Sequence, residues 1–423
     1  MIQISFGSQQ RNNQVKWQSQ PLLPFASWRL TSAFPTCLLP TAYCLVFAAL
    51  CAAQTPPAKP YAAINRDAVS YNGPGRDGGH DLAGSEIRLG LLTPLAGPRQ
   101  AEGEALRRAA EMAIEEENAT SLPGGRRLTL VARDESGPWG QAATQIVHMV
   151  FDDQAVALIT SAEGGSAHLA EQIGNKIGVP ILTLSSDTTT TEINLPWVFR
   201  LGPTDAMQAQ AFARDIYQNK KLQRVILLGQ DDHDGRAGAE EFIKAARELS
   251  SVEPTQIVIE PGIFAEETTG KALANAQAVV IWTDTATANR LAARVRELQP
   301  AAPLYLCRKA AEGESSGESQ PPCPACSSQD AGQWIAAAPE SRQVWAGFSQ
   351  HYRQRFGAEP GIGVAQAYDA VRLLAVSLRQ SGPNRARLRD TLAEVSGFSG
   401  ASGVISFDHA GNDTSQVMLL KLR

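Results

Sequence analysis

The stretch VALITSAEGGSAHLAEQIGNKIGVPILTLSSDTTTTE, residues 156–192, decides the fold. It contains two short runs that are apolar throughout, at 156–160 and 179–184, and a helical pattern over 166–177 lies between them. Strands without polar alternation are buried on both faces, which is typical of parallel strands covered by helices. The stretch therefore predicts one strand–helix–strand unit of a parallel sheet.

The same unit repeats along the chain. Further apolar runs stand at 87–92, 128–133, 224–229, 256–260, 278–282 and 303–307. Amphipathic segments separate them; in EALRRAAEMAIEEEN (104–118), Leu106, Ala110 and Ile114 share one face of a helix. These units are too many for one ordinary sheet. The sequence therefore predicts two doubly wound α/β lobes, with sites at the carboxyl ends of the strands.

The two lobes are expected to be joined by a multi-segment hinge, at which the chain crosses from one lobe to the other more than once. One crossover is predicted at FRLGPTDAMQ (199–208) and a second within 308–335, where residues 308–333 are expected to form a mobile loop. The predicted first lobe takes residues 86–203 and 335–396, and the predicted second lobe takes 204–334 and 397–423.

The composition excludes several classes of function. The chain has 423 residues, too many for one compact core, and its net charge of -5 gives no electrostatic basis for nucleic-acid binding. No catalytic, metal or nucleotide-binding motif stands in a suitable context, and the six histidines show no metal-like spacing. We therefore expect no enzyme, no cofactor and no metal.

The first 54 residues differ from the rest. A polar segment with only basic charges precedes an apolar run that ends in small residues near Ala53, as in an export signal. An uncleaved membrane anchor and a lipid anchor at Cys51 are the alternatives. Residues 55–85, rich in Pro, Gly and Asp, predict an irregular arm. The expected location is periplasmic or otherwise exported.

Three cysteines lie beyond the predicted signal. Cys323 and Cys326 form a CPAC motif in a polar loop, and Cys307 follows an apolar run. In an oxidising compartment this pattern favours a disulfide between Cys323 and Cys326. A metal site that includes Cys307, or redox chemistry, remains an alternative.

Polar loops follow the two strands of the opening stretch. TSAEGGSAH (160–168) and SSDTTTTE (185–192) place hydroxyls and free backbone N–H groups near helix starts, where a carboxylate binds well. Each loop alone is more typical of plain helix capping, by Ser166 and by Asp187 or a neighbour. Two such loops on consecutive parallel strands favour one shared site, with the candidate residues Ser161, Ser166, Ser185, Ser186 and Asp187.

Two strand-end loops in the second half add candidates from the other lobe. GQDDHDGRAG (229–238) and WTDTAT (282–287) supply Asp234, Trp282 and Asp284. Trp282 can either belong to the core or close over a ligand.

In their order along residues 86–420, these segments resemble the type I periplasmic binding proteins of branched-chain amino acid ABC transporters, the leucine/isoleucine/valine-binding type. IRLGLLTPLAGP (87–98) is similar to the opening strand and loop of that family, and GEALRRAAEMAIEEEN (103–118) to its first helix. AYDAVRLLA (367–375) resembles its Tyr-Asp-Ala helix, and GFSGASGVISFDHAGN (397–412) its closing Gly-rich segment.

The resemblance implies a function. Two lobes would close on a small ligand and deliver it to an ABC permease in the membrane. Ser166, Ser185 and Asp187 would hold the ligand's carboxylate, and the second lobe would contribute Asp234 and Trp282. The expected ligand is an amino acid or a similar small polar metabolite. The alternative is a ligand-sensing or regulatory protein of the same fold.

Three departures from the family pattern redistribute charge at this site. Asp234-Gly235 stands where the family often has Tyr-Gly, and Asp187 stands where a hydroxyl is common. Arg308-Lys309 stands where the family usually has an acidic residue that holds the ligand's ammonium group. The identity of the ligand therefore stays open.

Overall fold

The computed structural model describes residues 71–120, 122–138, 140–192, 195–260, 266–311, 331–334, 339–415, 417 and 419–421. The predicted export signal, Cys323, Cys326 and most of the predicted loop at 308–333 lie outside these described residues. Within the described ranges, no helix is both long and apolar enough to cross a membrane.

The first sheet has five strands in the order β2-β1-β3-β4-β5, and all of its pairs are parallel. Its strands are β1 (Glu86–Thr93), β2 (Arg127–Asp134), β3 (Ala157–Thr160), β4 (Ile181–Thr183) and β5 (Val198–Arg200). Successive side chains of β3 and β4 point to opposite faces and join different cores, as the pleat requires. The central strands are apolar throughout because both faces of the sheet are covered.

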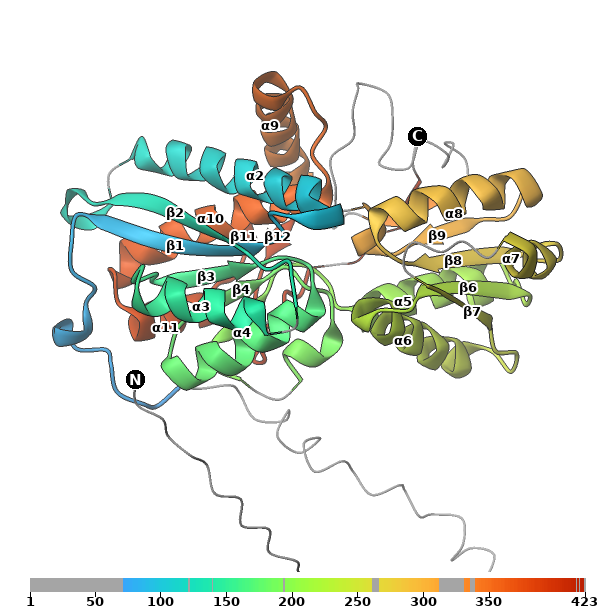
Figure 1. The fold of residues 1–423 in the computed structure, drawn as a ribbon, viewed down its shortest axis with the longest axis horizontal. Helices are drawn as coiled ribbons and strands as arrows, with labels where there is room; N and C mark the ends of the chain where they lie inside the picture. The colour runs from blue at the N-terminus through green and yellow to red at the C-terminus, as the bar shows by residue number, and fades with distance from the viewer. Residues whose placement is uncertain are drawn as a thin grey trace, which may run out of the picture. The chain divides into compact units, whose positions relative to one another are not determined.

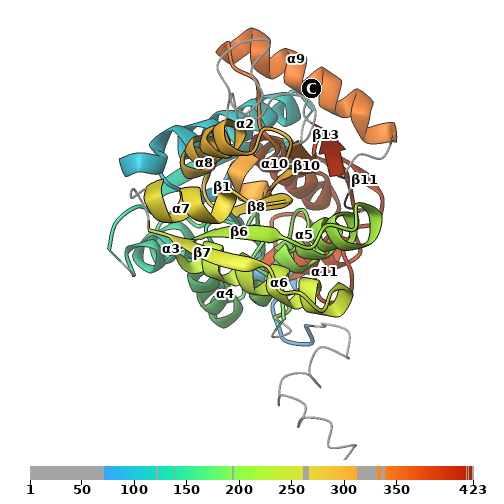
Figure 2. The ribbon, with the colours of Figure 1, turned by 90° about the vertical axis from the view of Figure 1, so that its right-hand side faces the viewer.

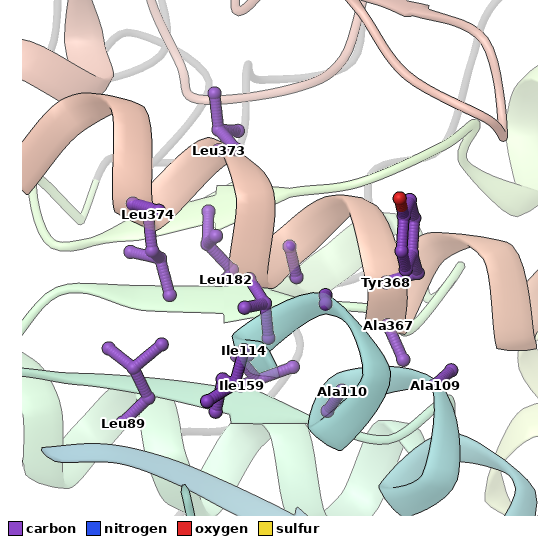
Figure 3. Packing of buried hydrophobic residues seen from close by; sticks show 14 of the residues in the cluster. Leu89, Ala109, Ala110, Ile114, Ile159, Leu182, Ala367, Tyr368, Leu373 and Leu374 are labelled. Atoms are coloured by element: carbon purple, nitrogen blue, oxygen red, sulfur yellow. The ribbon is translucent and has the colours of Figure 1, made fainter. Parts of the chain in front are cut away.

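Helices cover both faces of this sheet (Figure 1). On one face, α2 (Gln100–Asn118) and α10 (Ile362–Ser381) pack on Leu89, Ile159 and Leu182, as Figure 3 shows. On the other face, α3 (Gln141–Phe151) and α4 (Gly164–Ile177) enclose a smaller core with Leu92, Leu158 and Ile181. We call this sheet and its helices the first lobe.

The second sheet has six strands in the order β13-β10-β9-β8-β6-β7. They are β6 (Val225–Gln230), β7 (Thr255–Ile259), β8 (Ala278–Trp282), β9 (Leu304–Leu306), β10 (Ala331–Trp334) and β13 (Leu419–Lys421). Only β13, at the edge, runs antiparallel to its neighbour among the described pairs. In Figures 1 and 2, helices lie on both sides of this sheet: α5 (Asp205–Ala213), α6 (His233–Leu249), α7 (Glu266–Leu273) and α8 (Thr285–Leu298). This is the second lobe.

The prediction of two doubly wound lobes with parallel sheets is confirmed. The edge strand β13 was not predicted from the sequence. The remaining elements are α9 (Pro339–Phe356), α11 (Arg385–Ala393), β11 (Phe398–Ser399) and β12 (Val404–Ile405). Short helical turns lie at Gly78–His80, Gly97–Arg99, Pro123–Gly125, Thr188–Thr190, Arg214–Asn219 and Arg308–Ala311.

The chain changes lobes just after β5. Gly202 has a positive φ of 84° there, and its N–H donates to the Asp413 carboxylate at 3.1 Å. A side chain at this position would also meet the amide of Gln366. The predicted lobe boundary at residue 397 stays a prediction; Ala401 and Ile405 pack in the core of the first lobe before the chain reaches β13.

The described part of the N-terminal arm is fixed to the first lobe. Arg76 forms an ion pair with Asp390 of α11, and the N–H of Leu82 donates to the carbonyl of Pro383. Residues 71–85 are therefore held against the first lobe by contacts with residues near α11.

Gly238 in α6 packs directly on the indole of Trp282, and an added methyl group would overlap with the ring. We predict that Gly238→Ala lowers the free energy of unfolding by about 1–3 kcal/mol, because an overpacked core must shift. Gly347→Ala is the matched control, because this exposed glycine of α9 has no atom near the added methyl. The free energy of unfolding of this control variant should rise by up to about 1 kcal/mol, because alanine has a higher helix propensity than glycine. Urea unfolding measures both, and equal effects of the two changes would contradict the described packing.

Candidate functional site

A cavity of about 580 Å³ lies at the carboxyl ends of the first three strands of the first lobe. Loops that follow β1 and β2 and the start of α4 form its walls, and Asp284 from the second lobe also lines it. Pro94, Pro138 and Leu169 give it apolar surface. Its volume lies in the range of small-molecule sites, and the carboxyl ends of parallel strands are where open α/β sheets bind ligands.

The Glu135 carboxyl is buried in the wall of this cavity. The Ser161 hydroxyl donates to Oε1, whereas Oε2 has no hydrogen-bond partner among the described residues. Burial raises the pKa of the Glu135 carboxyl to about 8, and the positive charge of Arg99 and the nearby hydroxyls only partly oppose this. Because a buried polar atom is normally paired, Oε2 is the atom of this wall that still needs a partner; it is itself buried, so a ligand reaches it only when the neighbouring side chains move.

Arg99 supplies the positive charge of the cavity wall. Its guanidinium forms ion pairs with Glu102, at 2.6 Å, and with Glu163. Burial alone would lower the pKa of Arg99, but Glu102 and Glu163 raise it well above the usual value. The wall therefore carries one fixed cation beside several carboxyl groups.

The two lobes meet next to the cavity in a buried charge network. Lys309, which follows β9 in the second lobe, forms ion pairs with Asp234 of α6 and with Glu163 of the first lobe, the latter at 3.4 Å. The N–H of Gly164 donates to Asp234 Oδ1 at 3.0 Å. Burial alone would lower the pKa of the Lys309 ammonium, but these two carboxylates raise it well above the usual value. Lys309 therefore stays a cation.

Asp187 lies at a second contact between the lobes. Its Oδ1 accepts from the N–H of Thr189 at 2.9 Å and so caps the turn Thr188–Thr190. Its Oδ2 lies 3.1 Å from Nε2 of His168 and 2.6 Å from Nε2 of His233. Burial alone would raise the pKa of Asp187, but the hydrogen bonds from these imidazoles and from Thr189 hold it well below its usual range.

The structure brings some of the predicted site residues together. Ser166 and Asp284 line the cavity, and Ser161 reaches it through Glu135. Asp187 and Asp234 converge on Gly164, where a side chain would overlap with Asp234 and press on Asp187. Their predicted roles in ligand binding stay predictions.

The other three predicted residues lie away from the cavity. The Ser185 carbonyl accepts from the buried Arg200 guanidinium, and the Ser186 carbonyl accepts from the N–H of Asp205. Trp282 is 2% exposed and packs in the core of the second lobe, with its ring centroid 5.9 Å from that of Phe212. Of the two alternatives for Trp282, the structure has the core position.

Residues that the sequence did not single out contribute most of the charge. Glu135 is the second residue after the predicted strand at 128–133, so the rule used for the serine loops would have found it. Glu163, His168 and His233 stand in the strand-end loops at 160–168 and 229–238, so the same rule applies to them. Their pairing across the lobes carries no local signal, because the partners lie far along the chain.

Comparison with known proteins identifies similar folds and sequences. The family model described as "Periplasmic binding protein" matches residues 86–420. "Leu/Ile/Val-binding protein homolog 7" of Brucella abortus is 28% identical over 153 residues, 36% of this chain and 37% of that protein. "Leu/Ile/Val-binding protein BraC3" of Rhizobium johnstonii is 23% identical over 43% of this chain and 49% of that protein. The chain thus spans about half or less of these curated relatives.

Solved structures share the fold over most of the chain. The branched-chain amino acid transporter substrate binding protein LivJ from Streptococcus pneumoniae, in complex with isoleucine, has a TM-score of 0.67 at 20% identity, covering 80% of this chain and 96% of that one. An ABC transporter solute binding protein from R. palustris, in complex with benzoate, has a TM-score of 0.68 at 19% identity, covering 80% and 93%.

The pKa of Glu135 predicts a pH dependence of stability. Between about pH 4.5 and 8 the unfolded chain has released this proton while the folded chain retains it. Stability should therefore fall as the pH rises through this window, by at most about 1.4 kcal/mol per pH unit. Glu135→Gln removes the titration, so the variant should gain stability relative to the native protein as the pH rises.

Urea unfolding across this window measures the difference between variant and native protein at each pH. Groups that do not interact with Glu135 titrate equally in both proteins and cancel in the difference. A difference that stays constant from the acidic to the alkaline end would contradict a buried, protonated Glu135.

Proposed function

The chain belongs to the periplasmic binding protein family, and from this premise we propose that it captures a small solute between its lobes for an ABC transporter. The solute is an amino acid or a closely similar metabolite with an amine or amide donor. The observation that carries the proposal is the cavity with Glu135 Oε2 in its wall, an atom that has no hydrogen-bond partner among the described residues.

The chemistry of the cavity supports this class of ligand. Glu163 and Asp284 bring negative charge to the cavity beside the guanidinium of Arg99. A cationic group of the ligand placed beside Glu135 lowers the pKa of that carboxyl and favours its ionised form, which then accepts from the ligand. The first turn of α4 leaves N–H groups near Gly165 and Ser166, which suit the ligand's carboxylate. Proline and leucine side chains suit an apolar remainder. Relatives named as leucine-, isoleucine- and valine-binding proteins agree with this choice.

The position of Lys309 defines where this ligand binds. The Lys309 ammonium already forms ion pairs with Asp234 and Glu163. An ammonium group of the ligand would therefore add little binding free energy beside these two carboxylates. The ligand therefore occupies the neighbouring space beside Glu135 and Ser166. Asp284 reaches the same space from the second lobe, which couples binding to the closed arrangement of the lobes.

The remaining parts of the proposal concern the cell. The predicted export signal supports a location outside the cytoplasm, and the proposed partner is a membrane permease that receives the loaded form. The protein acts by binding and release, without catalysis. A sensing role in the same fold would use the same closure but a different membrane partner.

Isothermal titration with a panel of compounds tests the ligand class. The panel holds branched and linear aliphatic amino acids, the corresponding amines and amides, and carboxylates without an amine, such as benzoate. We predict saturable binding of at least one compound that carries an amine or amide donor. Glu135→Gln should weaken that binding at least tenfold, because it changes the group that the donor meets. Glu297→Gln, at an exposed ion pair at the far end of α8, is the control and should bind as the native protein does.

Two results would contradict the proposal. One is a panel in which no compound binds a folded protein. The other is a ligand whose affinity is the same in the native protein and in Glu135→Gln.

A further inference from the structure

Three side chains that can bind a metal ion converge where the lobes meet. They are His168 of α4, Asp187 after β4 and His233 at the start of α6, and one donor atom from each lies within 4.8 Å of the others. Both imidazoles direct Nε2 at the same oxygen, Asp187 Oδ2. Two elements of the first lobe and one of the second therefore supply the cluster.

The surroundings hold this geometry. Glu171 Oε2 lies 2.9 Å from Nδ1 of His168, which orients the ring so that Nε2 faces Asp187. A carboxylate behind a histidine is the usual second partner of a metal-binding imidazole. The Thr189 hydroxyl lies 2.9 Å from the same Nε2 and offers a further oxygen. The cluster thus has an oriented imidazole and a neighbouring hydroxyl in place.

The charges near the cluster also suit a cation. Asp187 and Glu171 are 2% and 1% exposed and bring two carboxylates to one place. The nearby Arg200 guanidinium donates instead to the Ser185 carbonyl and to the hydroxyls of Thr190 and Thr191. The side chains of His168 and His233 are 26% and 44% exposed, so an ion can reach them from solvent.

From this arrangement we infer that His168, Asp187 and His233 bind one divalent transition-metal ion, of the Zn²⁺ class, between the two lobes. Two imidazole nitrogens and one carboxylate suit Zn²⁺, Co²⁺ or Ni²⁺ and disfavour Mg²⁺ and Ca²⁺, which prefer oxygen ligands. In a tetrahedral zinc site with bonds of about 2.0–2.1 Å, donor atoms lie about 3.3 Å apart. The contacts of 3.1 and 2.6 Å therefore need to open by less than about 1 Å.

The ion enters by exchange with protons. Any proton on the Nε2 atoms leaves to solvent, and each freed lone pair binds the metal, while the carboxylate of Asp187 binds without losing a proton. Three protein ligands leave a fourth position for water or for the Thr189 hydroxyl. Because His233 comes from the second lobe, the bound ion links α6 to the first lobe.

Titration calorimetry of the purified protein with Zn²⁺ tests this site. The native protein should bind one Zn²⁺ that Mg²⁺ and Ca²⁺ do not displace. His168→Ala and His233→Ala should each weaken binding at least tenfold. His351→Ala is the matched control, because His351 forms an exposed pair with Glu116 in the first lobe alone and should not affect the affinity. Circular dichroism checks that every variant folds. If His233→Ala does not fold, the milder variant His233→Gln replaces it in the zinc titration.

Zinc binding by thiol ligands needs a separate control experiment, because Cys323 and Cys326 can also bind zinc. The double variant Cys323→Ser, Cys326→Ser should retain the ion, and Co²⁺ bound to it should show bands of nitrogen and oxygen ligation without thiolate charge transfer. Binding that is lost in this variant, or that persists in His168→Ala and His233→Ala, would overturn the inference. A native protein without saturable Zn²⁺ binding would overturn it as well. None of these outcomes bears on the solute site, whose test depends on Glu135.

Discussion

The buried ammonium of Lys309 sets the constraint on which the rest of the site depends. A lysine that is 7% exposed needs anionic partners, and it finds them in Asp234 and Glu163, one from each lobe. Removing one partner of such a group typically costs about 3–5 kcal/mol, because a buried charge is left without compensation. The lobes are therefore joined by the chain's own charges before any solute binds. Gly164 must lack a side chain for the same reason, because its backbone approaches Asp234 at this junction.

This constraint separates two kinds of chemistry that lie side by side. On one side of the junction, the cavity around Glu135 and Arg99 has room for a small organic solute, and Glu135 Oε2 has no hydrogen-bond partner within the described part of the chain. On the other side, Asp187 is already surrounded by two imidazoles, which suit a metal ion better than a carboxylate ligand. Both places receive a residue from the second lobe, Asp284 or His233. Occupancy of either place can thus favour the closed arrangement.

The sequence was sufficient for the fold but only partly for the site. Apolar runs such as the one that became β3 are specified locally, because a strand buried on both faces needs no polar alternation. The loops after β3 and β4 were predicted to share one site; Asp187 lies next to Gly164 of the first loop, whereas of Ser166 and Asp187 only Ser166 lines the cavity. The core position of Trp282 depends on the small Gly238 above it, which belongs to another element. The partnership of Asp187 with His233 spans 46 residues, and no local pattern encodes it.

A crystal structure of the protein with a solute identified by screening tests the central claim most directly. We predict that density for the solute fills the cavity, with a donor atom within hydrogen-bond distance of Glu135 Oε2, while Lys309 still contacts Asp234 and Glu163. A solute bound between Asp187 and Asp234, with the Lys309 ammonium displaced from its two carboxylates, would contradict the account.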